Sequence, residues 1–169
     1  MSCTATPFEL AKGPLHDYGM LPPMTWEAPK FRPHGASQFE ARGQTLVLHS
    51  QGPFNAEHVQ SLAPAFREFG GALQKNGPWA TINVVTRSLL STPEGIDMLR
   101  RSAQWTLEHL GRVAAAYVIA MDVEGRFIML PEIRRSCEGI MPIEIFESLA
   151  PAEEWALARI AAAAGARAS

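Results

Sequence analysis

Two spacings of hydrophobic residues follow one another along this chain, and the change between them is sharpest in residues 79–111. Residues 80–86, Ala-Thr-Ile-Asn-Val-Val-Thr, are rich in β-branched side chains, which favours a strand. From residue 93 the apolar positions recur three and four residues apart, which predicts a helix with one core-facing stripe: Ile96, Leu99, Ala103, Leu107 and Leu110. This strand, loop and helix form the centre of the predicted fold.

The ends of the predicted helix carry typical capping residues. Thr92 is a good N-cap, and Pro93 suits the first helical position, because its missing N–H needs no partner there. Glu94 and Asp97 lie near the positive end of the helix dipole, which stabilises carboxylates. Gly111 is a typical residue at which a helix ends.

A β-hairpin and a broken helix precede this centre. Residues 38–41 and 44–49 predict two strands joined by a tight Arg42-Gly43 turn. Asn55 is expected to cap the helix that follows, whose core-facing stripe comprises Val59, Leu62, Phe66, Phe69 and Leu73. Pro64 should kink this helix, because proline lacks the N–H that bonds to the preceding turn.

After the centre, strands and helices continue to alternate. Residues 112–120 are almost continuously apolar, as expected for a parallel strand with helices on both faces. A turn, a helix, a strand and a last helix are predicted over residues 122–125, 128–137, 142–146 and 148–161. This order predicts an α/β fold: a mixed β-sheet of about five strands with an N-terminal hairpin and three to four helices packed on it.

Composition divides the chain into three parts. Residues 1–36 contain six of the 13 prolines together with scattered apolar side chains, which predicts an extended N-terminal arm. We expect this arm to pack across the domain or across a partner subunit, and in the second case to support a homodimer. Residues 37–162 are then the α/β domain, and residues 163–169 a frayed tail.

Length and charge narrow the class of protein. A chain of 169 residues can form one domain with a sizeable core. Its net charge of −2 provides no general basic field for nucleic acid. The longest apolar run, Val113–Met121, is about half the length of a membrane helix. Because the amino terminus also lacks a signal-peptide pattern, we expect a cytoplasmic protein with no membrane span and no nucleic-acid partner.

No set of residues in the sequence has the spacing of a catalytic or metal site. The five histidines show no metal-ligand spacing, although His49 and His58 flank a Gly-Pro turn that could bring them together. Cys137 has no neighbouring histidine to activate it, so we expect a small buried residue rather than a nucleophile. We therefore expect a protein that is not an enzyme and uses no metal and no cofactor.

The loop between the central strand and helix is the candidate binding site. Loops at the carboxyl ends of parallel strands commonly hold ligands, and this loop combines a cation, hydroxyls and a helix N-terminus. The candidate residues are Arg87, Ser88, Ser91, Thr92, Glu94 and Gly95. Two interpretations stay open: a contact for an anion, a polar headgroup or another protein, or hydroxyls that only serve the helix backbone.

The order of elements resembles that of the STAS domain, including the SpoIIAA-like small bacterial proteins. The resemblance spans residues 37–160 and rests on four segments: the hairpin followed by Gly52-Pro-Phe-Asn55, the central strand before Ser91-Thr-Pro-Glu-Gly95, the apolar strand Val113–Ile119, and Ile145–Leu149 before the last helix. It implies a non-enzymatic binding or regulatory module that contacts a protein partner through the central strand, loop and helix.

The sequence departs from that family at the start of the central helix. Regulators of the anti-sigma-antagonist type carry an Asp-Ser-Ser-Gly-like motif there, in which a serine is phosphorylated. Gly95 matches the glycine of this motif, but Pro93-Glu94 stands where the serine pair would be. Ser91 and Thr92 are close by and are candidate phosphosites, because a helix N-terminus stabilises a phosphate.

A small hydrophobic ligand is the alternative partner. SpoIIAA-like proteins resemble, in general fold, the lipid-carrying CRAL-TRIO domains, in which a cavity between sheet and helices could hold such a ligand. The candidate pocket residues here are Met98, Trp105, Phe127 and Met129, with Ile128 and Leu130 beside them. In this interpretation the chain is a carrier or sensor of a lipid-like molecule.

Overall fold

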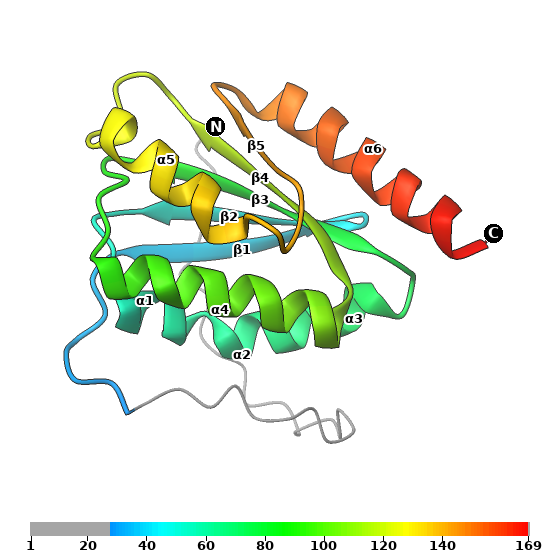
Figure 1. Cartoon of the computed structure of the whole chain (residues 1–169), viewed down its shortest axis with the longest axis horizontal. Helices are drawn as coiled ribbons and strands as arrows, with labels where there is room; N and C mark the ends of the chain where they lie inside the picture. The colour runs from blue at the N-terminus through cyan, green and yellow to red at the C-terminus, as the bar shows by residue number, and fades with distance from the viewer. Residues whose placement is uncertain (1–27, 169) are drawn as a thin grey trace, which may run out of the picture.

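Five strands, in the same order as in the sequence, form one sheet at the centre of the computed structural model, which describes residues 28–168 (Figure 1). The first pair is antiparallel and the other three pairs are parallel. The strands are β1 (Ala36–Arg42), β2 (Thr45–Gln51), β3 (Trp79–Thr86), β4 (Arg112–Ile119) and β5 (Ile143–Phe146). The predicted mixed sheet with an N-terminal hairpin is therefore confirmed.

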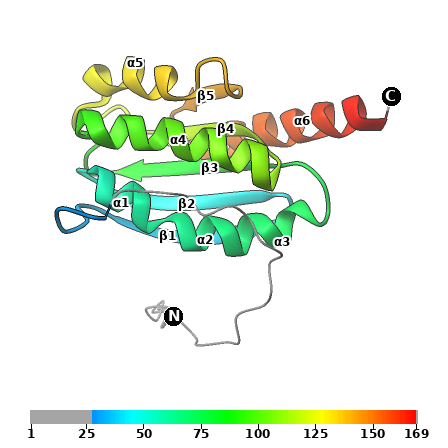
Figure 2. The ribbon, with the colours of Figure 1, turned by 60° about the horizontal axis from the view of Figure 1, so that its bottom comes forward.

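Helices cover both faces of this sheet (Figure 2). They are α1 (Ala56–Ser61), α2 (Ala63–Ala65), the π-helical turn η1 (Phe66–Gly70), α3 (Gly71–Gln74), α4 (Pro93–Leu110), α5 (Arg126–Cys137) and α6 (Leu149–Ala168). Right-handed crossovers that advance across a sheet in one direction place their helices on the same face. The helices from α1 to α5 accordingly lie on one face, which we call the α4 face, and α6 returns over the other, the α6 face.

The two faces divide the strand residues by their alternation. On β3, Ala80 and Ile82 pack beneath α6, whereas Trp79 and Val85 pack on the α4 face. β4 is buried along almost its whole length, which confirms the prediction of a strand with helices on both faces. In the part of the chain that the structure describes, no helix is long and apolar enough to cross a membrane.

The first helical region is broken, as Pro64 predicts. The α-helical pattern stops at Ser61 and resumes for one short turn, and the π-helical turn η1 follows. Phe39 of β1 packs against two aromatic rings of this turn, with centroids 5.8 Å from Phe66 and 5.9 Å from Phe69. Despite the break, the aromatic residues of the predicted stripe therefore pack towards the core.

Three predicted boundaries differ from the structure. The hairpin turn lies at Gly43-Gln44, one residue later than predicted, because β1 continues to Arg42. Helix α5 begins at Arg126 rather than Ile128, after Gly125 in a left-handed conformation. Residues 163–168, predicted as a frayed tail, are helical, because the alanine-rich end of α6 has high helix propensity.

Part of the predicted arm lies within the described residues. The backbone N–H of Phe31 donates to Glu57 Oε1 at 3.1 Å, and the N–H of His34 donates to Asn55 Oδ1 at 2.9 Å. The Asn55 amide in turn donates to the Arg32 carbonyl at 2.9 Å. Residues 28–35 therefore pack against the start of α1 of the same chain, whereas the prediction for residues 1–27 lies outside the described residues.

Candidate functional site

The central loop (Arg87–Thr92) lies at the carboxyl edge of the sheet and is fixed on both sides by backbone hydrogen bonds. On one side Phe54 N–H donates to the Leu90 carbonyl at 2.8 Å, and Thr92 N–H to the Phe54 carbonyl at 3.3 Å. On the other side Leu89 N–H donates to the Glu124 carbonyl at 2.8 Å, and Glu124 N–H to the Arg87 carbonyl at 3.0 Å. The loop is thus joined to both neighbouring loops of this edge.

The hydroxyls of this loop bond to backbone groups. Thr92 Oγ1 accepts from Gly95 N–H at 3.1 Å, which confirms the predicted N-cap of α4. Ser88 Oγ accepts from Leu90 N–H at 3.3 Å, and the residue is only 2% exposed. Ser91 Oγ donates weakly to the Thr92 carbonyl at 3.4 Å. Of the two candidate phosphosites, Thr92 is exposed and Ser91 is half-buried.

The charged members of the predicted binding loop face solvent, whereas its glycine is a packing residue. Arg87 and Glu94 are exposed, and Arg87 has a φ of 66°, a left-handed conformation that is uncommon for arginine. A Cβ on Gly95 would overlap the Ser91 hydroxyl and lie 3.4 Å from the Asn55 carbonyl carbon. Gly95 therefore allows the start of α4 to pack against the start of α1.

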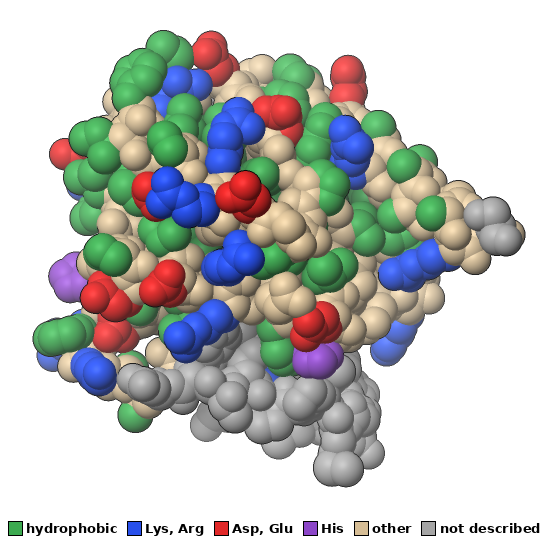
Figure 3. All heavy atoms as spheres, in the orientation of Figure 1, with side chains coloured by type: hydrophobic (Ala, Val, Ile, Leu, Met, Phe, Trp, Pro, Cys, Tyr) green, Lys and Arg blue, Asp and Glu red, His purple; other side chains and the backbone are tan. Residues whose placement is uncertain are grey.

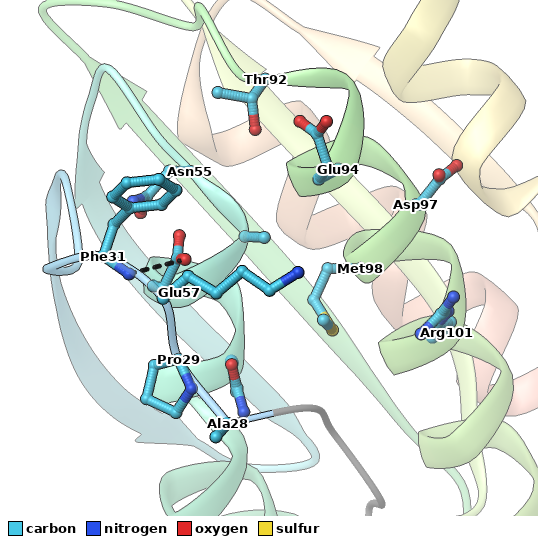
Figure 4. A pocket seen from close by; sticks show the side chains of 13 residues that line it. Ala28, Pro29, Phe31, Asn55, Glu57, Thr92, Glu94, Asp97, Met98 and Arg101 are labelled. Atoms are coloured by element: carbon cyan, nitrogen blue, oxygen red, sulfur yellow. Dashed lines mark hydrogen bonds between the residues drawn. The ribbon is translucent and has the colours of Figure 1, made fainter.

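A surface cleft of about 390 Å³, the α1–α4 cleft, opens beside this packing contact (Figure 4). One wall is the first half of α4, from which Glu94, Asp97 and Arg101 border the cleft around Met98. The opposite wall combines the start of α1 with residues 28–31, which the hydrogen bond from Phe31 to Glu57 holds in place. The cleft therefore combines apolar side chains on both walls, among them Met98 and Phe31, with charged groups of both signs.

A group of exposed hydrophobic residues lies at the same edge, in the turn after β4 and in the first turn of α5. Met121 is 54% exposed, Phe127 71% and Ile128 72%, and we call these three residues the edge patch. The Arg126 guanidinium lies 5.5 Å from the Phe127 ring centroid and donates through Nε to the Ile119 carbonyl at 3.2 Å. Figure 3 shows hydrophobic side chains at the end of the molecule where α5 begins.

The structure does not bring the predicted pocket residues together around one cavity. Met98 borders the α1–α4 cleft, Trp105 packs beside η1 under the Arg67 guanidinium, Phe127 is exposed, and Met129 is buried in the core. The chamber that does lie between sheet and helices measures about 60 Å³. A cavity of roughly 150 Å³ is needed to bind benzene, so this chamber is too small for a lipid-like ligand.

Polar groups nevertheless border this chamber. His58 Nε2 lies 3.0 Å from Ser37 Oγ, which lies 2.7 Å from Ser50 Oγ. Burial lowers the pKa of His58 below its ordinary value, so the imidazole is neutral at pH 7. His49 lies on the other face of the sheet, 3.6 Å from a Glu40 carboxylate oxygen. The two histidines are therefore not brought together.

The remaining candidate groups are possible metal ligands and the thiol of Cys137. Among the described residues, no group of three or more histidine, cysteine and carboxylate side chains could hold a metal ion. Cys137, the last residue of α5, is 3% exposed and packs in the core of the α4 face, which confirms the prediction of a small buried residue.

The cleft contains residues that the sequence did not single out as a site. From the sequence, Asp97 was placed only near the helix dipole, and Glu57 and Arg101 were not singled out. These residues meet only because α1 and α4 begin side by side. The sequence feature that could have indicated this close packing is the glycine in the first turn of α4, Gly95. No protein-family model matches this chain, and no curated protein matches its sequence.

Proposed function

We propose that this chain is a non-enzymatic binding or regulatory module of STAS-like type, which contacts a protein partner through the carboxyl edge of its sheet. The contact surface comprises the central loop, the first turns of α4 and the edge patch. The observation that carries the proposal is the exposure of Phe127 and Ile128, at 71% and 72%, next to that loop. Contiguous exposed apolar side chains of this size are typical of protein interaction sites.

Rigidity of the edge supports the same proposal. The central loop is bonded to the Phe54 segment and to the Glu124 segment, so the backbone that carries its exposed side chains is held in place before any partner arrives. Pre-organised surfaces lose less conformational entropy on binding. The backbone bonds between Glu124 and the central loop also place the segment that leads into α5, and with it the edge patch, beside that loop.

A carrier of a lipid-like ligand has less support. Its candidate residues are spread over a surface cleft, the side of α4, the edge patch and the core, and the chamber beneath α4 measures about 60 Å³. We expect a mass spectrum of the natively purified protein to contain no lipid-sized adduct. Such an adduct at stoichiometric abundance would favour the carrier instead.

The proposed contact can be tested with two exposed-residue variants. Wild-type protein and a Phe127→Ser, Ile128→Ser double variant are used to isolate partners from the native cell, and the affinity for any shared partner is then measured. We expect the double variant to bind at least about 30-fold more weakly, since central apolar anchors contribute about 2 kcal/mol or more. Leu157→Ser is the matched control, because Leu157 is 54% exposed on α6.

The pattern of binding by the variants shows whether the partner contacts the edge patch or the α6 side. If Leu157→Ser weakens binding and the double variant does not, the contact lies on the α6 side and the proposal is wrong. Equal binding by all three proteins would also contradict it. Circular dichroism of each variant confirms that the fold is retained, which we expect because the substituted side chains face solvent.

A further inference from the structure

Arg112 is buried at the first position of β4, beneath α4. It pairs with Trp79 in the register of the two strands, and only 6% of its surface is exposed. Its Nε is completely covered and has no hydrogen-bond partner. Among the described residues no ion pair or side-chain hydrogen bond of Arg112 is present, so its charge is not compensated by a carboxylate of this part of the chain.

Five other arginines, unlike Arg112, lie against oxygen acceptors. Arg42, Arg126, Arg134 and Arg135 each lie within 4 Å of a glutamate oxygen. Arg100 donates to two backbone carbonyls at the end of α5, at 3.2 and 3.0 Å. These guanidinium groups are therefore matched to oxygen acceptors, although most of them are far more exposed than Arg112.

The groups around Arg112 are neutral. The guanidinium lies 5.7 Å from the Phe66 ring centroid, and Tyr117 and Cys137 are close enough to interact with it electrostatically. Burial raises the pKa of Tyr117 well above its ordinary value, so the phenol keeps its proton and remains a donor. Burial also lowers the pKa of Arg112, which reflects the cost of an unpaired cation in this position.

We propose that Arg112 holds a compact anion at the start of β4, with the guanidinium as the charged donor. A buried charge that lacks a protein counter-ion is costly, and an anion from solution would compensate it.

Anion-dependent thermal unfolding tests this site. The melting temperature is measured at constant ionic strength while gluconate, a bulky anion, is replaced by chloride, phosphate or acetate in separate series. In the wild type we expect at least one series to raise the melting temperature by on the order of 5 °C at about 100 times its Kd. The series that responds identifies the size and charge of the anion.

Two variants decide whether the response belongs to Arg112. Arg112→Met should remove the anion response, and Arg112→Lys should weaken it, because lysine keeps the charge but not the planar set of donors. Arg67→Met is the matched control: Arg67 also has a covered, unpartnered Nε and also lies over an aromatic ring, at 5.3 Å from Trp105, but is half-buried. It should keep the full response.

The result that overturns the proposal is equally clear. A wild-type melting temperature that is the same in all four anions means that no anion binds, and a response that persists in Arg112→Met places the anion elsewhere. Should Arg112→Met fail to fold, the comparison of wild type with Arg112→Lys and Arg67→Met still decides the matter. An equal response in these three proteins would then contradict the assignment.

Discussion

The α6 face of the sheet is closed by small and aliphatic side chains, whereas the α4 face also buries an arginine, a tyrosine, a histidine and several hydroxyls. Beneath α6 the buried residues are Val47, Ala80, Ile82, Ala114, Ala116, Val118, Ala152, Ala156 and Ile160. Beneath α1 and α4 the buried polar residues include Ser50, His58, Thr81, Ser102, Thr106 and Arg112. The first face contributes mainly packing, with Thr45 as a buried polar residue on the same strand face as Val47. The second combines stabilisation with groups that can recognise ligands.

The two faces also differ in what they contribute to the carboxyl edge of the sheet. Helices α1, α4 and α5 begin there and belong to the α4 face, so their N-termini lie beside the central loop and the edge patch, whereas α6 begins at the same edge after β5 and returns over the α6 face (Figure 1). Helix α6 begins after β5 and contributes no residue to the α1–α4 cleft. If the comparison is right, substitutions beneath α6 should change stability alone, and substitutions beneath α4 should change stability and binding separately.

The largest effect is expected beneath α6. Ile82 is fully buried there, and Ile82→Ala should lower the free energy of unfolding by about 2–5 kcal/mol, because it removes buried methyl groups and leaves a cavity. Urea unfolding followed by circular dichroism measures this loss. Partner binding at the edge should be unchanged under conditions where the variant is folded. A folded variant with weakened binding would show that the two faces are not independent.

Arg112→Met should stabilise the folded protein, whereas Ile82→Ala should destabilise it. In gluconate buffer, where no compact anion compensates the charge, replacement by an apolar side chain of similar length should raise the free energy of unfolding by about 1–4 kcal/mol. The comparison with Ile82→Ala uses the same urea titration. A loss of more than about 2 kcal/mol, as for a well-matched core residue, would mean that Arg112 is compensated within the protein.

Thr92→Ala tests the cap at the start of α4. Removal of the acceptor for Gly95 N–H should lower the free energy of unfolding by about 1 kcal/mol. Ser91→Ala is the neighbouring control, and its effect should be smaller, since the Ser91 hydroxyl makes one long hydrogen bond of 3.4 Å. If the order of these two losses is reversed, the hydroxyl that matters at this edge is Ser91.

The smallest expected effect is on the pH dependence of the melting temperature. Burial lowers the pKa of His58 in the folded chain, so below the unfolded value of about 6.5 the unfolded chain binds more protons than the folded chain. This contribution to stability is complete above that pH and is lost as pH falls through the window below it. Comparison of melting temperatures at pH 7.5 and 5.5 should show a smaller decrease for His58→Gln than for wild type. Equal decreases would contradict the assignment.

Periodicity predicted the elements of both faces because burial repeats along helices and strands. Ala80 and Ile82 point to the α6 face while their neighbours on β3 point to the other, and the apolar stripe of α4 faces the core. Both patterns can be read from the spacing of apolar residues in the sequence. The cap at Thr92 and the stop at Gly111 were also predictable, since each depends on residues within one turn. The fold class rests on such local signals, and it is confirmed.

The site was less predictable because it depends on contacts between distant elements. In Phe127-Ile-Met-Leu130 four apolar residues adjoin, and only the packing of α5 decides that Met129 is buried while Phe127 and Ile128 face solvent. Arg112 is a second example: arginine is ordinarily exposed, but here it is 6% exposed and lies over the Phe66 ring of η1, which is distant in sequence. The α1–α4 cleft likewise exists only because two helices begin side by side.

The most direct test of the central claim is a hydrogen-exchange footprint of the protein bound to its partner. Amide exchange is compared with and without a saturating amount of the partner isolated by the wild-type protein. We predict slower exchange in residues 87–95 and 121–128 and unchanged exchange in α6. Protection confined to α6, with the carboxyl edge unaffected, would contradict the account.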